Sequence, residues 1–333
     1  MRPISYSRAT DTATAVAAVS ADPTSDFLAG GTTEIDLLRQ NILHPRRLVD
    51  INSLPLTGIA TTPEGGLSIG ALARMSEVAA EPVVRERFPM ICQALELGAS
   101  AQLRHMASMG GNLLQRVRCS YYRDAESPCN KREPDTGCSA IDGFSRGHAV
   151  LGTSEHCIAT HPSDVAVALM ALDARVHTLG PRGERAYAFD DFFLLPRDSP
   201  HREHPMEHGE LITAIEVPAT PVARHSLYLK VRDRESYEFA LASVAAALSV
   251  VDGTIADVRV ALGGLATKPW RARRVEDFLI GAPANRVNFD QAARVELADA
   301  RTTPMNAFKV ELARRAVVRA LETLSGDGSE SPA

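Results

Sequence analysis

Apolar and polar positions alternate with short, changing periods along the first third of the chain. Helical spacing of apolar residues predicts short helices, at residues 11–19, 34–40 and, with interruptions, 76–97. Compact apolar runs predict short strands, at residues 27–29, 47–51 and 67–72. This part of the chain is therefore expected to alternate between small strands and small helices.

The apolar period disappears between residues 116 and 160. Proline and glycine recur throughout this stretch, and only Tyr121, Tyr122 and Phe144 are large apolar side chains. A loop of this length inside a compact domain is either disordered or held by something other than a hydrophobic core. Four thiols in the same loop favour the second interpretation.

Regular patterns return after Ser163, a residue type that commonly caps helices. Helices are predicted at residues 164–172, 273–279, 289–300 and 307–324. Strands are predicted at residues 210–217, 227–232, 241–251 and 254–262. Asp252-Gly253 between the last two strands indicates a tight hairpin. We place a domain boundary at residues 218–223 and expect a disordered tail at 326–333.

Composition and charge exclude several classes of protein. The chain has 333 residues, of which 36 are Lys or Arg and 41 are Asp or Glu, so its formal net charge is −5. A nucleic-acid partner is not expected, because such proteins need a basic surface to displace counterions from phosphates. Neither a secretory signal nor an apolar run long enough for a membrane span is visible. We expect folding in the cytoplasm, and about two domains.

Two glycine pairs are the first candidates for a binding site. Gly30-Gly31 lies between a predicted strand and a predicted helix, and Gly110-Gly111 follows Ser108. Adjacent glycines let a phosphate approach the backbone N–H groups closely, although a single pair is more often an ordinary turn. Two such loops are suited to the two phosphates of a dinucleotide. Neither fits the glycine pattern of a Rossmann fold.

Four of the five cysteines lie in the aperiodic loop, with the spacing C-x9-C-x8-C-x18-C. They are Cys119, Cys129, Cys138 and Cys157. In a reducing compartment such a group more often binds metal than forms disulfides. The spacing is wider than in common zinc knuckles or ferredoxins, so a zinc ion, an iron–sulfur cluster and unligated thiols all remain open. Cys92, on a predicted apolar helix, is expected to be a buried small hydrophobe.

Several separate blocks resemble the flavoprotein subunits of the xanthine dehydrogenase and molybdenum hydroxylase family. These blocks are residues 27–32, 98–104, 108–112, 163–164, 210–218 and 228–232. The resemblance implies an α+β fold: a two-subdomain vanillyl-alcohol-oxidase-type (PCMH-type) FAD-binding domain at 1–219, then a smaller α+β domain at 223–325. The cysteine-rich stretch at about 116–160 is similar to an insertion found in some bacterial aldehyde oxidoreductases of this family, where it carries a 4Fe-4S cluster.

The resemblance also implies a set of site residues. For the FAD pyrophosphate these are Leu28, Ala29, Gly30, Gly31, Thr32, Thr33, Glu34, Ile35, Ser108, Met109, Gly110, Gly111 and Asn112. Asp164, Ile212 and Lys230 are implied as further flavin contacts. The ligands of the cluster are implied to be Cys119, Cys129, Cys138 and Cys157. The predicted cofactors are thus FAD and one 4Fe-4S cluster.

A chain of this family is expected to be an electron-transfer subunit without catalytic residues of its own. By resemblance, its partners are a molybdopterin-containing large subunit, a 2Fe-2S small subunit and an external electron acceptor, in a complex that oxidises aldehydes. Export of the folded complex to the periplasm on a signal-bearing partner is a further expectation. The alternatives are the flavin subunit of a 4-hydroxybenzoyl-CoA reductase and, in another class, a zinc-binding scaffold without redox function.

Histidines near the loops are weaker candidates for site residues. His148, His156 and His161 border the cysteine loop and are expected at most to adjust it through hydrogen bonds. His201, His204 and His208 lie in a polar loop and are expected to be solvated.

Overall fold

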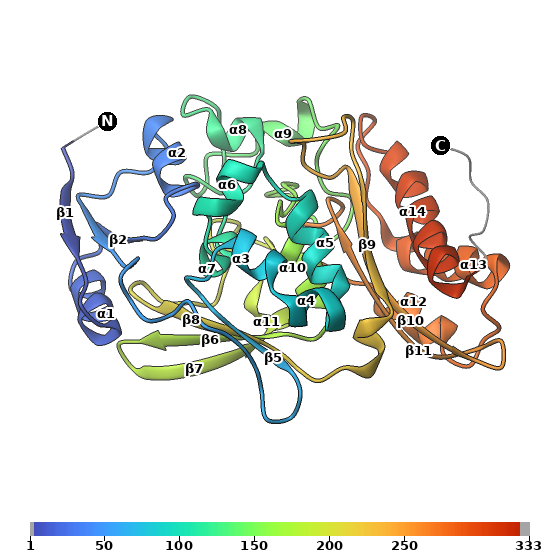
Figure 1. Ribbon diagram of the computed structural model, residues 1–333. Helices are drawn as coiled ribbons and strands as arrows, with labels where there is room; N and C mark the ends of the chain where they lie inside the picture. The colour runs from blue at the N-terminus through green and yellow to red at the C-terminus, as the bar shows by residue number, and fades with distance from the viewer. Residues whose placement is uncertain (1–2, 327–333) are drawn as a thin grey trace.

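In the computed structural model, which describes residues 3–326, the chain folds into three β-sheets with helices packed between and outside them (Figure 1). The predicted tail at 326–333 lies outside the described residues, except for Gly326. This glycine ends the last helix in the left-handed conformation, with φ of 82°.

The first sheet is parallel, with the strand order β1-β3-β2. Its strands and the two helices that connect them are β1 (Ser5–Arg8), α1 (Thr12–Ser20), β2 (Ser25–Leu28), α2 (Glu34–Arg39) and β3 (Arg47–Asp50). Parallel neighbours need such crossover helices, which explains the alternation in the sequence. The first glycine loop follows the carboxyl end of β2, where open parallel sheets commonly bind ligands.

The second sheet has the order β4-β5-β8-β6-β7 and is antiparallel. Its strands are β4 (Ile59–Thr61), β5 (Leu67–Gly70), β6 (Arg175–Gly180), β7 (Gly183–Ala188) and β8 (Leu211–Val217). The helices packed with it are α3 (Met75–Ala80), α4 (Pro82–Arg87), α5 (Pro89–Leu97), α6 (Ala101–Met106), α7 (Met109–Leu113), α10 (Asp164–Ala171) and α11 (Phe189–Phe192). The interrupted helix predicted at 76–97 is broken by Pro82 and Pro89, each of which starts a new helix.

The third sheet forms the C-terminal part of the molecule, residues 226–325. Its antiparallel strands, in the order β12-β11-β10-β9, are β9 (Ser226–Val231), β10 (Ala242–Val251), β11 (Thr254–Gly263) and β12 (Trp270–Arg271). One face is covered by α12 (Arg273–Leu279), α13 (Arg286–Glu296) and α14 (Phe308–Ser325), and the other by α5 and α10 (Figure 1). Short 3-10 turns lie before β9, at Pro221–Arg224, and after α13, at Leu297–Asp299. The predicted hairpin at Asp252-Gly253 is confirmed, with φ of 50° and 75°.

Strand β10 belongs to two hydrophobic cores at once. Val244, Ala246 and Leu248 pack with the C-terminal helices, whereas Ala245 and Ala247 pack with the core that contains α10. Successive side chains of a strand point to opposite faces, so a strand covered on both faces is apolar throughout. Alanine on the second face lets α10 approach the sheet closely.

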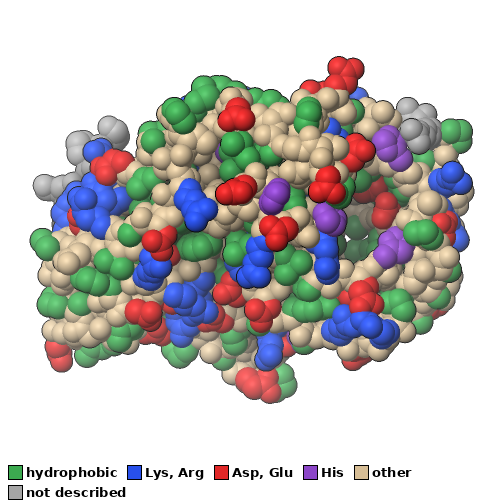
Figure 2. All heavy atoms as spheres, turned by 180° about the vertical axis from the view of Figure 1, so that it is seen from behind, with side chains coloured by type: hydrophobic (Ala, Val, Ile, Leu, Met, Phe, Trp, Pro, Cys, Tyr) green, Lys and Arg blue, Asp and Glu red, His purple; other side chains and the backbone are tan. Residues whose placement is uncertain are grey.

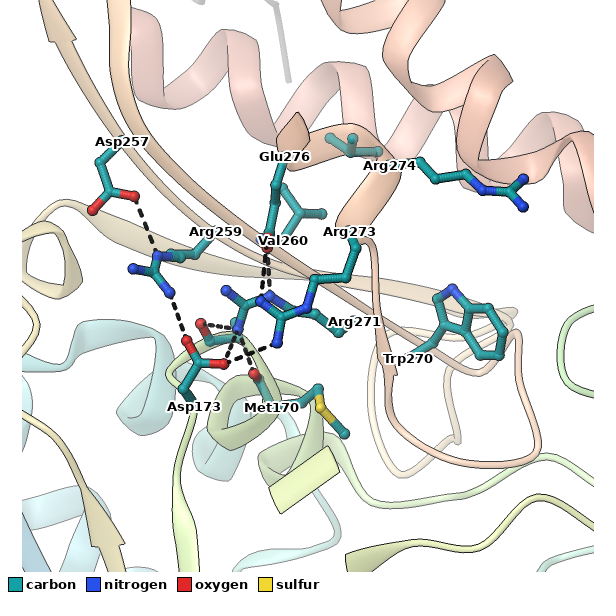
Figure 3. A network of polar contacts seen from close by, with 12 residues as sticks. Met170, Asp173, Asp257, Arg259, Val260, Trp270, Arg271, Arg273, Arg274 and Glu276 are labelled. Carbon is teal, nitrogen blue, oxygen red and sulfur yellow. Dashed lines mark hydrogen bonds and ion pairs between the residues drawn. The ribbon is translucent and has the colours of Figure 1, made fainter. Parts of the chain in front are cut away.

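A buried arginine joins the C-terminal part to the end of α10 (Figure 3). Arg271 donates hydrogen bonds of 2.7 Å to the carbonyl oxygens of Met170 and Ala171. It also forms ion pairs with Asp173 at 3.1 Å and with Glu276 at 2.5 Å. The last carbonyl groups of a helix have no hydrogen-bond donors within the helix, and here the Arg271 guanidinium donates to two of them.

Most predicted elements are confirmed, with shifts at their ends. The helix predicted at 289–300 begins earlier, at Arg286, because the Asn285 side chain caps it by accepting from the Asn288 N–H. The hairpin β6–β7, the strand β1 and the single-turn helices α8 (Ser120–Arg123) and α9 (Ser139–Asp142) were not predicted. The loop at 116–160 otherwise lacks regular structure, as expected.

The surface carries both signs of charge. Figure 2 shows Lys and Arg side chains interspersed with Asp and Glu over the face opposite to that of Figure 1. Among the described helices, none combines the length and the apolar character that crossing a membrane requires.

Candidate functional site

The two glycine loops meet in the folded chain, although they are about eighty residues apart in the sequence. A Cβ atom on Gly30 would lie 1.8 Å from the carbonyl oxygen of Met106, so only glycine permits this contact. Arg74 donates to that same oxygen at 2.6 Å and to Asn52 at 2.8 Å, and Asn52 donates to the Ala29 carbonyl at 2.9 Å. The loops are therefore tied together by backbone contact and by a side-chain bridge.

The second loop is shaped by local caps. Ser108 caps α7, and its Oγ accepts a 3.2 Å hydrogen bond from the Gly111 N–H. Asn112 Oδ1 accepts at 2.5 Å from Ser163, the residue that caps α10. In the first loop, Gly31 has φ of 71°, a conformation that side chains disfavour.

The loops line a cleft with two compartments. The first compartment has a volume of about 300 Å³ and the second of about 450 Å³, and Thr32, Thr33 and Gly111 line both. The other predicted residues of the first compartment are Ala29, Gly30, Gly31, Glu34, Ser108, Gly110 and Ile212. Those of the second are Asn112, Asp164 and Lys230. The cleft thus brings together residues predicted from five separate blocks of the sequence.

Three predicted residues do not line either compartment. Leu28 ends β2, and the Ile35 residue is 38% exposed beyond the cleft on α2. Met109 is fully buried in the core. Their neighbours in each loop line the cleft, so the cleft contains both predicted loops but not these three residues.

A buried polar group forms the wall of the second compartment nearest the C-terminal part. Lys230 donates to Asp164 at 2.8 Å and to the Leu97 carbonyl at 3.0 Å, and Tyr228 donates to Asp164 at 2.6 Å. Burial raises the pKa of Asp164, and the Lys230 ammonium opposes that rise. The two strand residues come from β9 and the carboxylate from the first turn of α10.

A second charged group lies in the first compartment. Burial and the nearby Asp26 raise the pKa of Glu34 to about 7, while Arg116 opposes this rise. Oε1 of Glu34 has no hydrogen-bond partner among the described residues. Arg116 is instead paired with Glu203 at 2.6 Å. Glu34 is therefore a half-buried carboxyl that lines the first compartment, and among the described residues its Oε1 has no partner.

The four loop cysteines surround one small cavity, separate from the cleft. Cys119, Cys129, Cys138 and Cys157 all line it, and a β-bridge places Cys129 opposite Cys138. Burial raises the pKa of Cys119 and of Cys157 to about 11. Within residues 3–326, no three His, Cys, Asp or Glu side chains are arranged to hold a metal ion. Cys92 lies elsewhere, buried as predicted, with its Sγ 3.2 Å from the Ala79 carbonyl oxygen.

Polar side chains hold the backbone of the cysteine loop. Arg132 donates to the carbonyl oxygens of Tyr121 and Tyr122 at 2.8 and 2.9 Å. Asn130 accepts from the Gly137 N–H at 2.8 Å, and Lys131 is paired with Glu203 at 3.0 Å. Hydrogen bonds and ion pairs thus act together with a small apolar cluster, in which Val117, Tyr122 and Ala159 of the loop are buried.

The histidines depart in part from expectation. His148 lies 3.2 Å, through Nε2, from Sγ of Cys119, whereas the side chain of His156 is 46% exposed and pairs with Asp198. His161 packs edge-on against Phe193. The prediction that His204 is solvated is wrong: its ring packs against Phe192 and Phe193, and burial lowers its pKa to about 4.

Of the other two histidines in that polar loop, His201 is exposed, as predicted. His208 reaches the Val19 carbonyl oxygen at 2.9 Å through Nε2.

Several cleft residues were not predicted. Arg118, Arg234, Tyr237 and Phe239 line the second compartment, and the Arg118 guanidinium lies 5.1 Å from the centre of the Phe239 ring. The last three belong to the loop between β9 and β10, which begins after Val231. The alternation of charged and aromatic residues at 234–239 is the sequence feature that indicates such a wall.

Family models cover nearly the whole chain. Residues 2–220 match the FAD binding domain in molybdopterin dehydrogenase, and residues 227–324 match the CO dehydrogenase flavoprotein C-terminal domain. Two solved structures have the same fold: the CO dehydrogenase from Oligotropha carboxidovorans (TM-score 0.76, 22% identity, 98% of this chain and 99% of that chain) and quinoline 2-oxidoreductase from Pseudomonas putida 86 (TM-score 0.76, 20% identity, 99% of both chains).

Two related proteins of named function are more similar in sequence to this chain than the two solved structures are. The chain is 46% identical to the aldehyde oxidoreductase FAD-binding subunit PaoB of Escherichia coli over 323 residues, which cover 96% of this chain and 98% of that protein. It is 28% identical to the glyceraldehyde dehydrogenase medium chain of Sulfolobus acidocaldarius, over 84% of this chain and 82% of that protein.

Proposed function

Because the chain belongs to the FAD-binding flavoprotein family of the molybdopterin dehydrogenases, we propose that it is the FAD- and 4Fe-4S-containing electron-transfer subunit of a molybdenum-dependent aldehyde oxidoreductase. The observation that carries the proposal is the similarity, 46% over 96% of this chain, to an aldehyde oxidoreductase FAD-binding subunit. The chain passes electrons from its partner subunits to an external acceptor.

The cleft fits FAD on the chemistry of its walls. At Gly111 an added Cβ would meet one atom, Oγ of Ser108 at 2.9 Å, so the loop backbone stands open to an approaching phosphate. Two compartments on either side of the glycine loops provide room for the two ends of a dinucleotide. When bound, FAD supplies reversible redox chemistry, and the protein supplies position and electrostatics.

Each wall has a separate task in this proposal. Ser108 to Asn112 and Ala29 to Thr33 bind the pyrophosphate. Lys230, held by Asp164, presents a buried positive charge to the second compartment, where it stabilises negative charge on the bound group. Arg118 and Phe239, in contact with each other, form another wall of the same compartment.

In this proposal the cysteine cavity holds a 4Fe-4S cluster and not a single zinc ion. A zinc ion draws its thiolate ligands to about 2.3 Å from one point, whereas a 4Fe-4S cluster distributes four thiolates over four irons. Four cysteines line the cavity, which is the number of thiolates that a 4Fe-4S cluster takes. The choice of a cluster over a zinc ion rests on the resemblance of the four-cysteine loop to the insertion of the aldehyde oxidoreductase flavoproteins.

The partners follow from the same proposal. A molybdopterin-containing large subunit oxidises the aldehyde, and a 2Fe-2S small subunit delivers electrons to this chain. Folding and cofactor insertion take place in the cytoplasm, and a signal-bearing partner takes the folded complex to the periplasm. Affinity purification of the tagged chain, separately from cytoplasm and periplasm, tests both statements: recovery of the chain alone, loaded with flavin and oxidising aldehydes without molybdenum, contradicts them.

The absorption spectrum of the purified chain tests the cofactors. FAD gives resolved bands in the near ultraviolet and blue, and a 4Fe-4S cluster adds a broad brown shoulder. A spectrum with flavin bands alone, with zinc in the metal analysis, would replace the cluster by a zinc site. Electron flow from the acceptor side toward molybdenum would identify a reductase of the 4-hydroxybenzoyl-CoA type instead.

A further inference from the structure

Two fully buried polar side chains at the start of α14 take no part in the cleft. Asn306 and Lys309 are each 0% exposed. Lys309 donates to the carbonyl oxygens of Gly147, His148 and Gly264, at 3.1, 2.9 and 2.5 Å. A buried ammonium is costly unless all its protons are used, and here three carbonyls use them.

Asn306 holds the same segment from the other side. Its Nδ2 donates to the carbonyl oxygens of Ala149 at 3.2 Å and of His148 at 3.5 Å, and its Oδ1 accepts from the Thr303 N–H at 2.7 Å. The N–H of His148 donates to the Ser145 carbonyl at 2.9 Å. The backbone of His148 is thus fixed at both its donor and its acceptor.

The ring of His148 points to the cysteine cavity. Its Nε2 lies 3.2 Å from Sγ of Cys119, and the residue is only 8% exposed. Nδ1 is buried and has no hydrogen-bond partner among the described residues. A proton on Nε2, directed at the sulfur, makes a hydrogen bond, whereas a proton on Nδ1 would be left unpaired in the interior. The geometry therefore favours Nε2–H as a donor to Cys119.

We propose that Lys309 and Asn306 are positioning residues, which hold His148 as a hydrogen-bond donor to Cys119, and that this hydrogen bond raises the reduction potential of the cluster. The inference rests on the proposed function, because it requires Cys119 to be a cluster ligand. A donor to a ligand sulfur stabilises the more negative, reduced cluster, so its removal lowers the potential. The C-terminal part thereby adjusts a cofactor held by the N-terminal part.

The test is a potentiometric titration of the purified complex, followed by the EPR signal of the reduced cluster. His148→Leu is expected to shift the cluster potential to more negative values, with iron and FAD content unchanged. His148→Gln, which keeps a donor, is expected to recover part of the shift. His201→Leu, at an exposed histidine that does not line the cysteine cavity, is the control and should leave the potential unchanged.

Lys309→Met and Asn306→Ala test the positioning step and should shift the cluster potential in the same direction as His148→Leu. Asn306→Ala removes no charge and serves if Lys309→Met does not fold. An unchanged potential in His148→Leu with a full cluster would overturn the inference, as would loss of iron in that variant. A wild-type chain without iron would instead overturn the proposed function.

Discussion

Lys230 and Asp164 form an ion pair of 2.8 Å that crosses from the C-terminal part to the first turn of α10. The side chain of Lys230 is 1% exposed and that of Asp164 is 10% exposed. A buried pair of this kind adds little stability compared with apolar residues, but removing one partner leaves a buried charge uncompensated. The pair therefore matters both for the wall of the cleft and for the contact between the two parts.

Replacing Lys230 by Met is expected to lower the free energy of unfolding by about 3 kcal/mol, because Asp164 then stays buried without its cation. FAD content should fall as well. Urea unfolding of the chain measures the first effect, and the ratio of FAD to protein the second. The double variant Lys230→Met/Asp164→Asn, which removes both charges, should regain much of the stability but not the FAD. Equal loss in the single and double variants would contradict this account.

Valine at Gly111 is expected to weaken FAD binding more than about tenfold, a loss of roughly 1.4 kcal/mol or more in binding free energy. Its Cβ would lie against Ser108 Oγ and on the open side of the loop. Gly31→Val should act in the same direction, because its φ of 71° strains any side chain. Isothermal titration of the FAD-free chain measures the affinity. Gly58→Ala, where a Cβ would meet nothing within 4 Å, is the control, and full FAD binding by Gly111→Val is the contrary result.

Serine at Cys119, Cys129, Cys138 or Cys157 is expected to lower the iron content and to loosen the loop, because metal ligation adds to the order that polar contacts and a small apolar cluster give it. Iron analysis and limited proteolysis of each variant measure the two effects. Cys92→Ser is a matched control, since that thiol is buried against the Ala79 carbonyl and a hydroxyl keeps the contact. Iron lost with Cys92→Ser but kept with Cys138→Ser would refute the ligand set.

Glu34 predicts a pH dependence of the stability of the FAD-free chain. Its pKa rises from 4.5 to about 7 on folding, so the folded state binds the proton more tightly than the unfolded state. Stability is therefore highest below the unfolded value and falls as the pH rises through about 7, by about 2 kcal/mol after allowance for partial exposure. Urea unfolding at pH 5 and pH 8 should show a smaller decrease for Glu34→Gln than for the wild type. The exposed Glu64→Gln is the control; equal decreases in all three chains would disprove the assignment.

The sequence predicted those parts of the fold and site that depend on local patterns. The glycine pairs, the cap at Ser163 and the turn at Asp252-Gly253 each follow from the conformation that their residue types prefer. The edge strand β7 was missed because its residues, Gly183–Ala188, are mostly exposed and do not show a clean apolar alternation. Tertiary contact decides the structure of such a segment, and periodicity does not report it.

Among the polar residues of the site, too, some were predicted and others depend on tertiary contacts. Lys230 and Asp164 came from the family resemblance, whereas their partner Tyr228 and the bridge from Arg74 to Met106 depend on contacts between distant segments. His204 shows the converse error: a polar loop suggested solvation, but two phenylalanine rings enclose the side chain. A single sequence does not contain these long-range distances.

The C-terminal part holds α10 at both of its ends, through Lys230 and Tyr228 at the start and Arg271 beyond the last turn. A rotation of one part against the other must break both attachments together. The second compartment has walls from both parts, so its width is locked by the same helix. In the proposed electron-transfer role, a cofactor between two parts that are attached at two points stays at a fixed distance from neighbouring redox centres, and electron tunnelling slows steeply as that distance grows.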